Sequence, residues 1–179
     1  MKYLLLLSIM ILSGCSVATP PYEATVANAQ VLKNSDVKPL SVGDFKTDKK
    51  LNSISLRASS LNSSVGNSFG DYLTEALTTE LKLAQVWSGV SNTVVSGELL
   101  KNDVDVSGFS VGTGIISVQF KVKKGDQLVF DKMITANNEF ESSFIGSIAI
   151  PNGQMSYVDL VQNLVKALFL DPEFIKAVS

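Results

Sequence analysis

The clearest pattern along the chain is an apolar stripe with helical spacing that begins just after Ser68. Apolar side chains recur there every three or four residues, at Phe69, Tyr72, Leu73, Ala76, Leu77, Leu81 and Ala84. This spacing places them on one face of an α-helix, which we expect to end near Gln85. Ser68 and Asp71 fit the start signal of such a helix. A second stripe over 157–168 predicts another helix that begins at Ser156.

Between these two stripes, alternation of apolar and polar residues predicts β-strands. The cleanest example is 116–122, where apolar side chains at even positions alternate with serine, glutamine and lysine at odd positions. Such a strand has one face in the core and the other in water. Gly125 and Asp126 then mark a hairpin turn. The pattern of 51–61 fits a strand or a loop. Three further strands are expected, over 37–45, 93–107 and 128–140.

The predicted order is therefore strand, helix, three strands, helix, with a short C-terminal helix that Asp171 caps and Pro172 begins. A meander of strands with one polar face needs cover on its other face only, and two single-stripe helices supply that cover. These elements predict one α+β domain over 37–179. We expect a two-layer sandwich with a four-stranded, mainly antiparallel sheet and both main helices on one face.

The start of the chain predicts export. Lys2 precedes an apolar run over 4–12, which is too short to span a bilayer as a helix, and this layout fits a secretory signal peptide over 1–14. Leu12-Ser13-Gly14-Cys15 resembles a bacterial lipobox, in which the cysteine is lipidated and becomes the first residue of the mature protein. The alternative is an ordinary signal peptide with a chance cysteine. Cys15 is the only cysteine in the chain, and lipidation explains an odd cysteine in an exported protein.

The segment 15–36 lacks clear periodicity and contains Pro20 and Pro21, so we expect a flexible tether between the lipid and the domain. The resemblance to bacterial lipoproteins implies three acyl chains on Cys15. By the same resemblance to enteric lipoproteins, Ser16 rather than an aspartate after the cysteine favours the outer membrane. We therefore expect a lipid-anchored protein at the outer membrane, with its domain facing the periplasm.

The composition narrows the chemistry that the chain can perform. There is no histidine, which removes the commonest general base, the usual serine-protease triad and most zinc sites. The single cysteine is the expected lipid carrier, which argues against thiol catalysis. The chain has 15 basic and 17 acidic residues and no basic cluster, which argues against a nucleic-acid partner. We expect no catalytic residue, no metal and no cofactor.

Four acidic residues form the one alternative to this view. Asp103 and Asp105 share one face of a strand, and Glu139 and Glu141 share one face of another, because side chains two residues apart point the same way. If the two strand ends meet, the four carboxylates would form a cation site for Ca²⁺ or a glycosidase pair. The pattern fits a solvated polar sheet face better.

The stretch 142–153 is apolar yet contains Gly146 and Pro151, so we expect a loop. An exposed apolar loop marks a site for a partner or a ligand, whereas a loop folded over the helix ends would be part of the core. The candidate partner or ligand surface consists of Phe144, Ile145, Ile148 and Ile150.

The lipobox and the element order together resemble the small Gram-negative envelope lipoproteins of the YajG and LptE kind. The resemblance is topological, and it implies a two-helix, four-strand sandwich on a lipid anchor with a non-catalytic role. We therefore expect a non-enzymatic, outer-membrane-anchored lipoprotein that binds or scaffolds another envelope protein or a lipid-like ligand, as an accessory of assembly or transport. The alternative is a small periplasmic hydrolase that uses the strand carboxylates.

Overall fold

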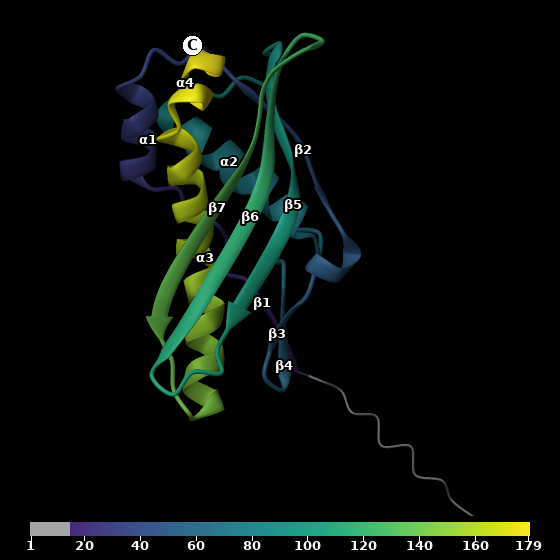
Figure 1. Ribbon diagram of the computed structural model, residues 1–179, viewed down its shortest axis with the longest axis vertical. Coiled ribbons are helices and arrows are strands. Elements are labelled where there is room, and N and C mark those ends of the chain that lie inside the picture. The colour runs from purple at the N-terminus through teal and green to yellow at the C-terminus, as the bar shows by residue number, and fades with distance from the viewer. Residues whose placement is uncertain (1–14) are drawn as a thin grey trace, which may run out of the picture.

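The main sheet of the structure has four strands, and two long helices cover one of its faces (Figure 1). The computed structural model describes residues 15–179, so the signal peptide predicted over 1–14 lies outside the described residues. β2 runs parallel to β5, and the other neighbouring strands are antiparallel. The expected α+β two-layer sandwich is confirmed. In sheet order, the strands are β2 (Ser41–Thr47), β5 (Thr93–Asp105), β6 (Val111–Lys124) and β7 (Gln127–Glu141).

The two covering helices bury the stripes that the sequence predicted. α2 (Phe69–Ala84) packs against β2, and α3 (Gly146–Phe169) packs across β7 and β6. The hydroxyl of Ser68 accepts a hydrogen bond from the backbone N–H of Asp71 at 3.2 Å, which caps the start of α2 as expected. Gln85 ends α2 in the left-handed conformation, with φ of 63°. Every residue of both predicted stripes is buried.

The first strand of the main sheet begins later than predicted. β2 starts at Ser41 because Leu40 pairs through a single bridge with Trp87, which follows α2. Phe45 is buried as expected, whereas Val42 is only partly buried. The backbone oxygen of Phe45 lies where a Cβ of Gly70 would be, so α2 approaches β2 closely only because that helix position is glycine.

A second, three-stranded sheet lies at one end of the main sheet and was not predicted (Figure 1). After a 3-10 turn (Lys49–Leu51), β3 (Ile54–Leu56) and β4 (Ser59–Asn62) form a short hairpin, so the ambiguous segment 51–61 contains two strands. β1 (Cys15–Ala18) joins this hairpin parallel to β4, with Cys15 opposite Ser59.

The flexible tether predicted over 15–36 is corrected by the structure. This segment forms β1 and α1 (Val26–Lys33), and α1 packs against α2 and α3. Tyr22 and Leu32 are buried in the hydrophobic core, and the hydroxyl of Thr25 caps α1. The sequence shows no sign of this, because Tyr22, Ala29 and Leu32 are too irregularly spaced to show a helical or strand period. Each of them is nevertheless buried in the hydrophobic core. The folded unit therefore includes the chain from Cys15 onward.

A buried carboxyl group holds this N-terminal segment in place. Glu80 of α2 is fully buried, and its Oε1 accepts hydrogen bonds from the Tyr22 hydroxyl at 2.7 Å, the Asn28 amide at 2.9 Å and the Thr25 backbone N–H at 3.2 Å. Its other oxygen, Oε2, has no hydrogen-bond partner. Burial and the neighbouring carboxyl group of Glu80 raise the pKa of Tyr22 far above its ordinary value, so the phenol stays protonated as a donor.

The predicted loop over 142–153 is largely helical, which is a second correction. α3 begins at Gly146 and continues through Pro151, ten residues before the expected start at Ser156. The proline sits in the second turn and removes only the hydrogen bond to the backbone oxygen of Ser147, which is an exposed residue. None of the helices described between residues 15 and 179 is both long and apolar enough to cross a membrane.

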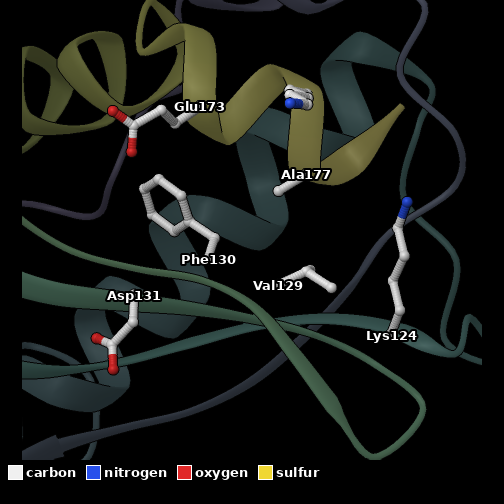
Figure 2. Close-up of a pocket in the computed structure, with 7 residues that line it drawn as sticks. Lys124, Val129, Phe130, Asp131, Glu173 and Ala177 are labelled. Atoms are coloured by element: carbon white, nitrogen blue, oxygen red, sulfur yellow. The ribbon is translucent and has the colours of Figure 1, made fainter.

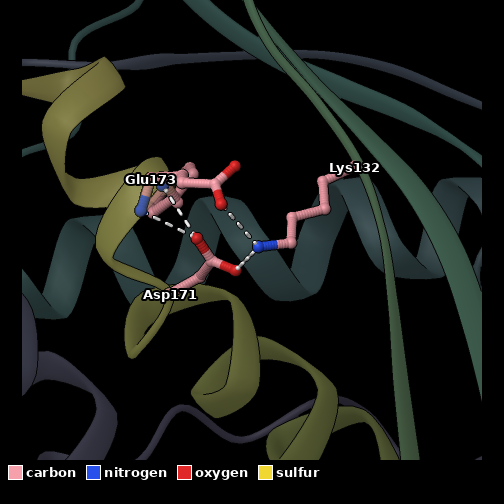
Figure 3. A network of polar contacts seen from close by, with 4 residues as sticks. Lys132, Asp171 and Glu173 are labelled. Carbon is pink, nitrogen blue, oxygen red and sulfur yellow. Dashed lines mark hydrogen bonds and ion pairs between the residues drawn. The ribbon is translucent and has the colours of Figure 1, made fainter.

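The chain ends in the short helix predicted after Asp171, α4 (Pro172–Val178). Asp171 accepts hydrogen bonds from the backbone N–H groups of Glu173 and Phe174, and Lys132 of β7 contacts Asp171 at 2.8 Å and Glu173 at 3.2 Å (Figure 3). Partial burial opposes ionisation of Asp171, but Lys132 and the two N–H groups outweigh it and hold the pKa of Asp171 below its ordinary value of 3.8. This network fastens α4 to the sheet.

Candidate functional site

Four exposed apolar side chains gather at one end of the domain, and we call them the apolar tip. They are Phe109, Phe144, Ile145 and Ile148, which are 80%, 75%, 56% and 44% exposed. The rings of Phe109 and Phe144 stack on each other with centroids 5.8 Å apart and planes 10° apart. An exposed apolar patch of this kind is a candidate binding surface.

Two connections between elements build the apolar tip. Phe109 comes from the loop between β5 and β6, Phe144 and Ile145 from the connection between β7 and α3, and Ile148 from the first turn of α3. The backbone N–H of Ser142 donates to the backbone oxygen of Ser110 at 2.9 Å, and the Ser142 hydroxyl donates to the Val106 oxygen at 3.3 Å. Segments far apart in the sequence are thereby held side by side.

Arg57 fixes the backbone beneath the tip. It lies in the turn between β3 and β4 in the left-handed conformation, with φ of 55°. Its guanidinium group donates to the backbone oxygens of Phe144 at 2.9 Å, Ser143 at 2.7 Å and Val106 at 2.7 Å. A planar group with a fixed fork of donors suits this task, because one side chain satisfies three carbonyls that belong to two different loops.

Cys15 lies at the same end of the domain as the apolar tip. Cys15 is exposed and pairs with Ser59 of β4, and Ser59 follows Arg57 by two residues. Because neighbouring strands are about 4.8 Å apart and each residue rises about 3.3 Å, the Cα atoms of Cys15 and Arg57 lie within about 12 Å of each other. Figure 1 shows the described chain beginning at the end of the molecule where α3 starts and where β5 joins β6. The predicted lipidation site and the tip therefore face the same side.

The predicted partner surface is only partly the surface that the structure displays. Phe144, Ile145 and Ile148 are exposed, whereas Ile150 turns inward and packs partly buried against the core. Sequence reasoning missed Phe109, although a lone phenylalanine between Gly108 and Ser110 was a signal that a loop carried an exposed aromatic ring. Arg57 was also missed, because its contacts are with residues far along the chain.

The four acidic residues of the cation-site alternative lie on the open face of the main sheet, near the tip. Asp105 and Glu139 flank Thr113, with which both pair in register. Asp103 and Glu141 pair with other residues of β6, and all four side chains are exposed. Within residues 15–179, no group of three or more His, Cys, Asp or Glu side chains lies close enough to hold a metal ion.

The setting of Asp105 differs from that of a glycosidase acid. The side chain and the backbone N–H of Ser107 hydrogen-bond to Asp105 and lower its pKa below the ordinary value of 3.8, whereas a glycosidase acid needs a raised pKa. Glu139 lines an open depression of about 470 Å³ together with Thr113 and Asn137, and no second carboxylate lines it. The arrangement favours a solvated sheet face.

A hollow of about 430 Å³ lies between β7 and α4, at the end of the domain away from the tip (Figure 2). Phe130 forms part of its wall, and the charged side chains around it are of both signs. Lys124 at its margin donates to the backbone oxygen of Ser179 at 3.0 Å. These contacts describe the seam where the last helix joins the sheet, and they bring no reactive groups together. The remaining lining residues are Val129, Asp131, Glu173, Lys176 and Ala177.

Fold and site together define a small α+β sandwich that displays an apolar tip beside an exposed cysteine. No protein-family model matches the sequence, and no curated protein matches it. Among solved structures, the chain is similar to the crystal structure of protein XCC0632 from Xanthomonas campestris, of the family model DUF330, with 10% identity and a TM-score of 0.61 over 86% of this chain and 92% of that chain. A structure of an uncharacterized protein is 10% identical, with a TM-score of 0.47 over 84% and 97% of the two chains. The likeness to XCC0632 concerns the fold alone.

Proposed function

We propose that this protein is a non-enzymatic lipoprotein, anchored to the outer membrane by lipid on Cys15, that binds or scaffolds another component of the cell envelope. The lipobox-like sequence before Cys15 supports the anchor, and Ser16 after it supports the outer membrane. The apolar tip is the surface we propose for binding an envelope protein or a lipid-like molecule. We propose that the domain faces the periplasm, since an outer-membrane lipoprotein of this kind would be exported by its signal peptide and held there by its lipid.

The single observation that carries this proposal is the placement of the apolar tip beside Cys15. Exposed phenylalanines are unfavourable on a freely diffusing protein unless something covers them. An anchor on Cys15 would hold the tip permanently close to one membrane and its proteins, which raises the effective concentration of a partner there. Kinship with envelope lipoproteins of the YajG and LptE kind is part of the proposal, and the fold shared with XCC0632 supports only its sandwich architecture.

The anchor is tested by Cys15→Ala in the full precursor. Membranes and soluble periplasm are separated, and the mass of the N-terminal peptide of the mature protein is measured. We expect the unaltered protein in the membrane fraction with acyl mass on Cys15, and the variant in the soluble periplasm. Ser55→Ala, at an exposed position of β3 in the same sheet, is the matched control. A Cys15→Ala protein that stays with the membrane would contradict the anchor.

The binding surface is tested in intact cells with a photo-crosslinking amino acid at Ile145. We expect adducts with an envelope protein or with lipid, because Ile145 is more than half exposed at the tip. The control carries the same amino acid at Val90, which is 92% exposed in the loop before β5, at the other end of the domain. Equal yields of adduct at the two positions would show that the tip is not a binding surface.

A further inference from the structure

The apolar tip has the chemistry of a surface that enters a membrane interface. Its four side chains contain no polar atom, and together they expose on the order of 400–500 Å² of apolar area, estimated from the usual size of aromatic and aliphatic side chains. Protein partners of stable complexes cover about 800 Å² per side, roughly twice what the tip offers. A small apolar protrusion is enough for a bilayer, because acyl chains and headgroups adapt to its shape.

Backbone carbonyls at the base of the tip have hydrogen-bond partners within the protein, as a membrane interface would require. Loop carbonyls normally rely on water, and in a membrane each one without a partner is costly. Arg57 satisfies the backbone oxygens of Val106, Ser143 and Phe144, three carbonyls at the base of the tip. The guanidinium group of Arg57 is thereby paired with backbone carbonyls of both loops that build the tip.

The position of Cys15 indicates which bilayer the tip would meet. The Cα atom of Cys15 lies within about 12 Å of that of Arg57, whose guanidinium group contacts the tip backbone directly. Cys15 belongs to β1, which is hydrogen-bonded to the domain, so no flexible spacer separates a lipid on Cys15 from the tip. A lipid inserted in a bilayer at this point would bring the tip to the surface of the same bilayer.

We infer that the apolar tip inserts into the interface of the bilayer that holds the lipid of Cys15, so that the domain stands on the membrane on two contacts. This inference rests on the proposed lipid anchor and names the lipid bilayer, not a protein, as the occupant of the tip. The acyl chains supply the affinity, and the tip sets the orientation of the domain. Phe109 and Phe144 lie roughly 5–10 Å deep, at the boundary between headgroups and acyl chains.

The experiment reads the environment of the tip directly. Trp87 is the only tryptophan in the chain, so Trp87→Phe gives a background in which Phe144→Trp reports from the tip alone. Val90→Trp in the same background is the control at the far end. The full-length mature lipoproteins are reconstituted in vesicles of phosphatidylethanolamine with a minor share of phosphatidylglycerol, with and without bromine atoms on the acyl chains. Mass measurement confirms the lipid on Cys15, and flotation confirms that each protein is bound to vesicles.

We expect brominated lipid to quench the tryptophan fluorescence of the Phe144→Trp protein about twofold or more, as insertion to the acyl boundary requires, and to leave the Val90→Trp control unchanged. Equal quenching at both positions would overturn the inference, because the domain would then lie flat on the membrane. A lipidated protein that floats with the vesicles but shows no quenching at position 144 would also overturn the inference. That result would favour a protein, and not the bilayer, as the partner that covers the tip. A protein without lipid on Cys15 would remove the anchor, and with it both the proposed function and this inference.

Discussion

The carboxyl group of Glu80 holds the segment around Tyr22 and Asn28 against α2, and replacing it with alanine tests that view. The side chain is fully buried, and Glu80→Ala leaves the Tyr22 hydroxyl and the Thr25 N–H without their acceptor. The Asn28 amide keeps a second bond, to the backbone oxygen of Gln162. Each buried donor without a partner costs about 1–3 kcal/mol, and the removed methylene groups add a smaller loss. Removal of the unpartnered Oε2 of Glu80 offsets part of this loss. We expect a net loss of about 3 kcal/mol in the free energy of unfolding.

Two measurements separate this account from a general loss of stability. Urea unfolding followed by circular dichroism gives the free energy, and hydrogen exchange shows where protection falls first. We expect the amides of α1 to exchange faster than those of β6 in Glu80→Ala, because the lost bonds hold α1 and not the sheet. Glu75→Ala, an exposed glutamate on the same helix, is the matched control. A Glu80→Ala protein within about 0.5 kcal/mol of that control, or one with uniform loss of protection, would refute the reasoning.

Four further outcomes are expected. Arg57→Ala should speed hydrogen exchange over 143–148 roughly tenfold, because about 1–2 kcal/mol of local stability is lost with the three hydrogen bonds; Arg57→Lys, which keeps the charge but not the fork, should exchange almost as fast. Phe144→Ser combined with Ile148→Ser should change the free energy of unfolding by less than about 1 kcal/mol, since both side chains are exposed, and a larger loss in urea would show that they are core. Above pH 10 the free energy of unfolding should fall by up to about 1.4 kcal/mol per pH unit for each buried phenol. The reason is that burial raises each folded-state pKa above the ordinary value of 10.0, so the phenols ionise first in the unfolded chain. Urea titrations between pH 9 and about 11.5 check this. The three phenols are those of Tyr22, Tyr72 and Tyr157. Asp171→Asn should be less stable than the unaltered protein at pH 7. The difference should begin to shrink as the pH falls to about 3.8 and vanish only below the lowered pKa of Asp171, where the carboxyl group is protonated in the folded protein as well. A difference that persists unchanged in acid would contradict the ion pair with Lys132.

The sequence predicted the main sheet and both covering helices because each of them carries its own periodic pattern. The stripe of α2 and the alternation of β6 repeat over several turns or pleats, so local spacing alone identifies them. The start of α3 was missed because Gly146 and Pro151 argue against a helix locally, whereas packing of Ala149 and Gly153 against the domain overrides them. The second sheet was missed because its strands are only three or four residues long.

The residues of the candidate site also fall into those that local sequence indicates and those that depend on contacts far along the chain. Phe144, Ile145 and Ile148 were recognised because an apolar run in a region of poor helix chemistry is visible in the sequence. Ile150 was assigned to the surface with them because an unassigned loop has no period to show which side chains turn inward. Arg57 could not be recognised, because its role depends on contacts 49 to 87 residues away. The N-terminal segment depends likewise on Glu80, whose contacts with Tyr22 and Asn28 are 58 and 52 residues away along the chain.

The geometry of the strands determines what such an anchored domain could reach. β6 runs from Val111, beside the tip, to Lys124 at the opposite end of the molecule, and its 14 residues extend roughly 40–45 Å. With a lipid alone on Cys15 the domain would rotate freely about its anchor. With the tip as a second contact, the sheet would stand away from the bilayer and hold the α4 end at about that height. The open face of the main sheet, where Glu98, Gln119 and Met133 lie next to one another across β5, β6 and β7, would then face sideways, along the plane of the membrane.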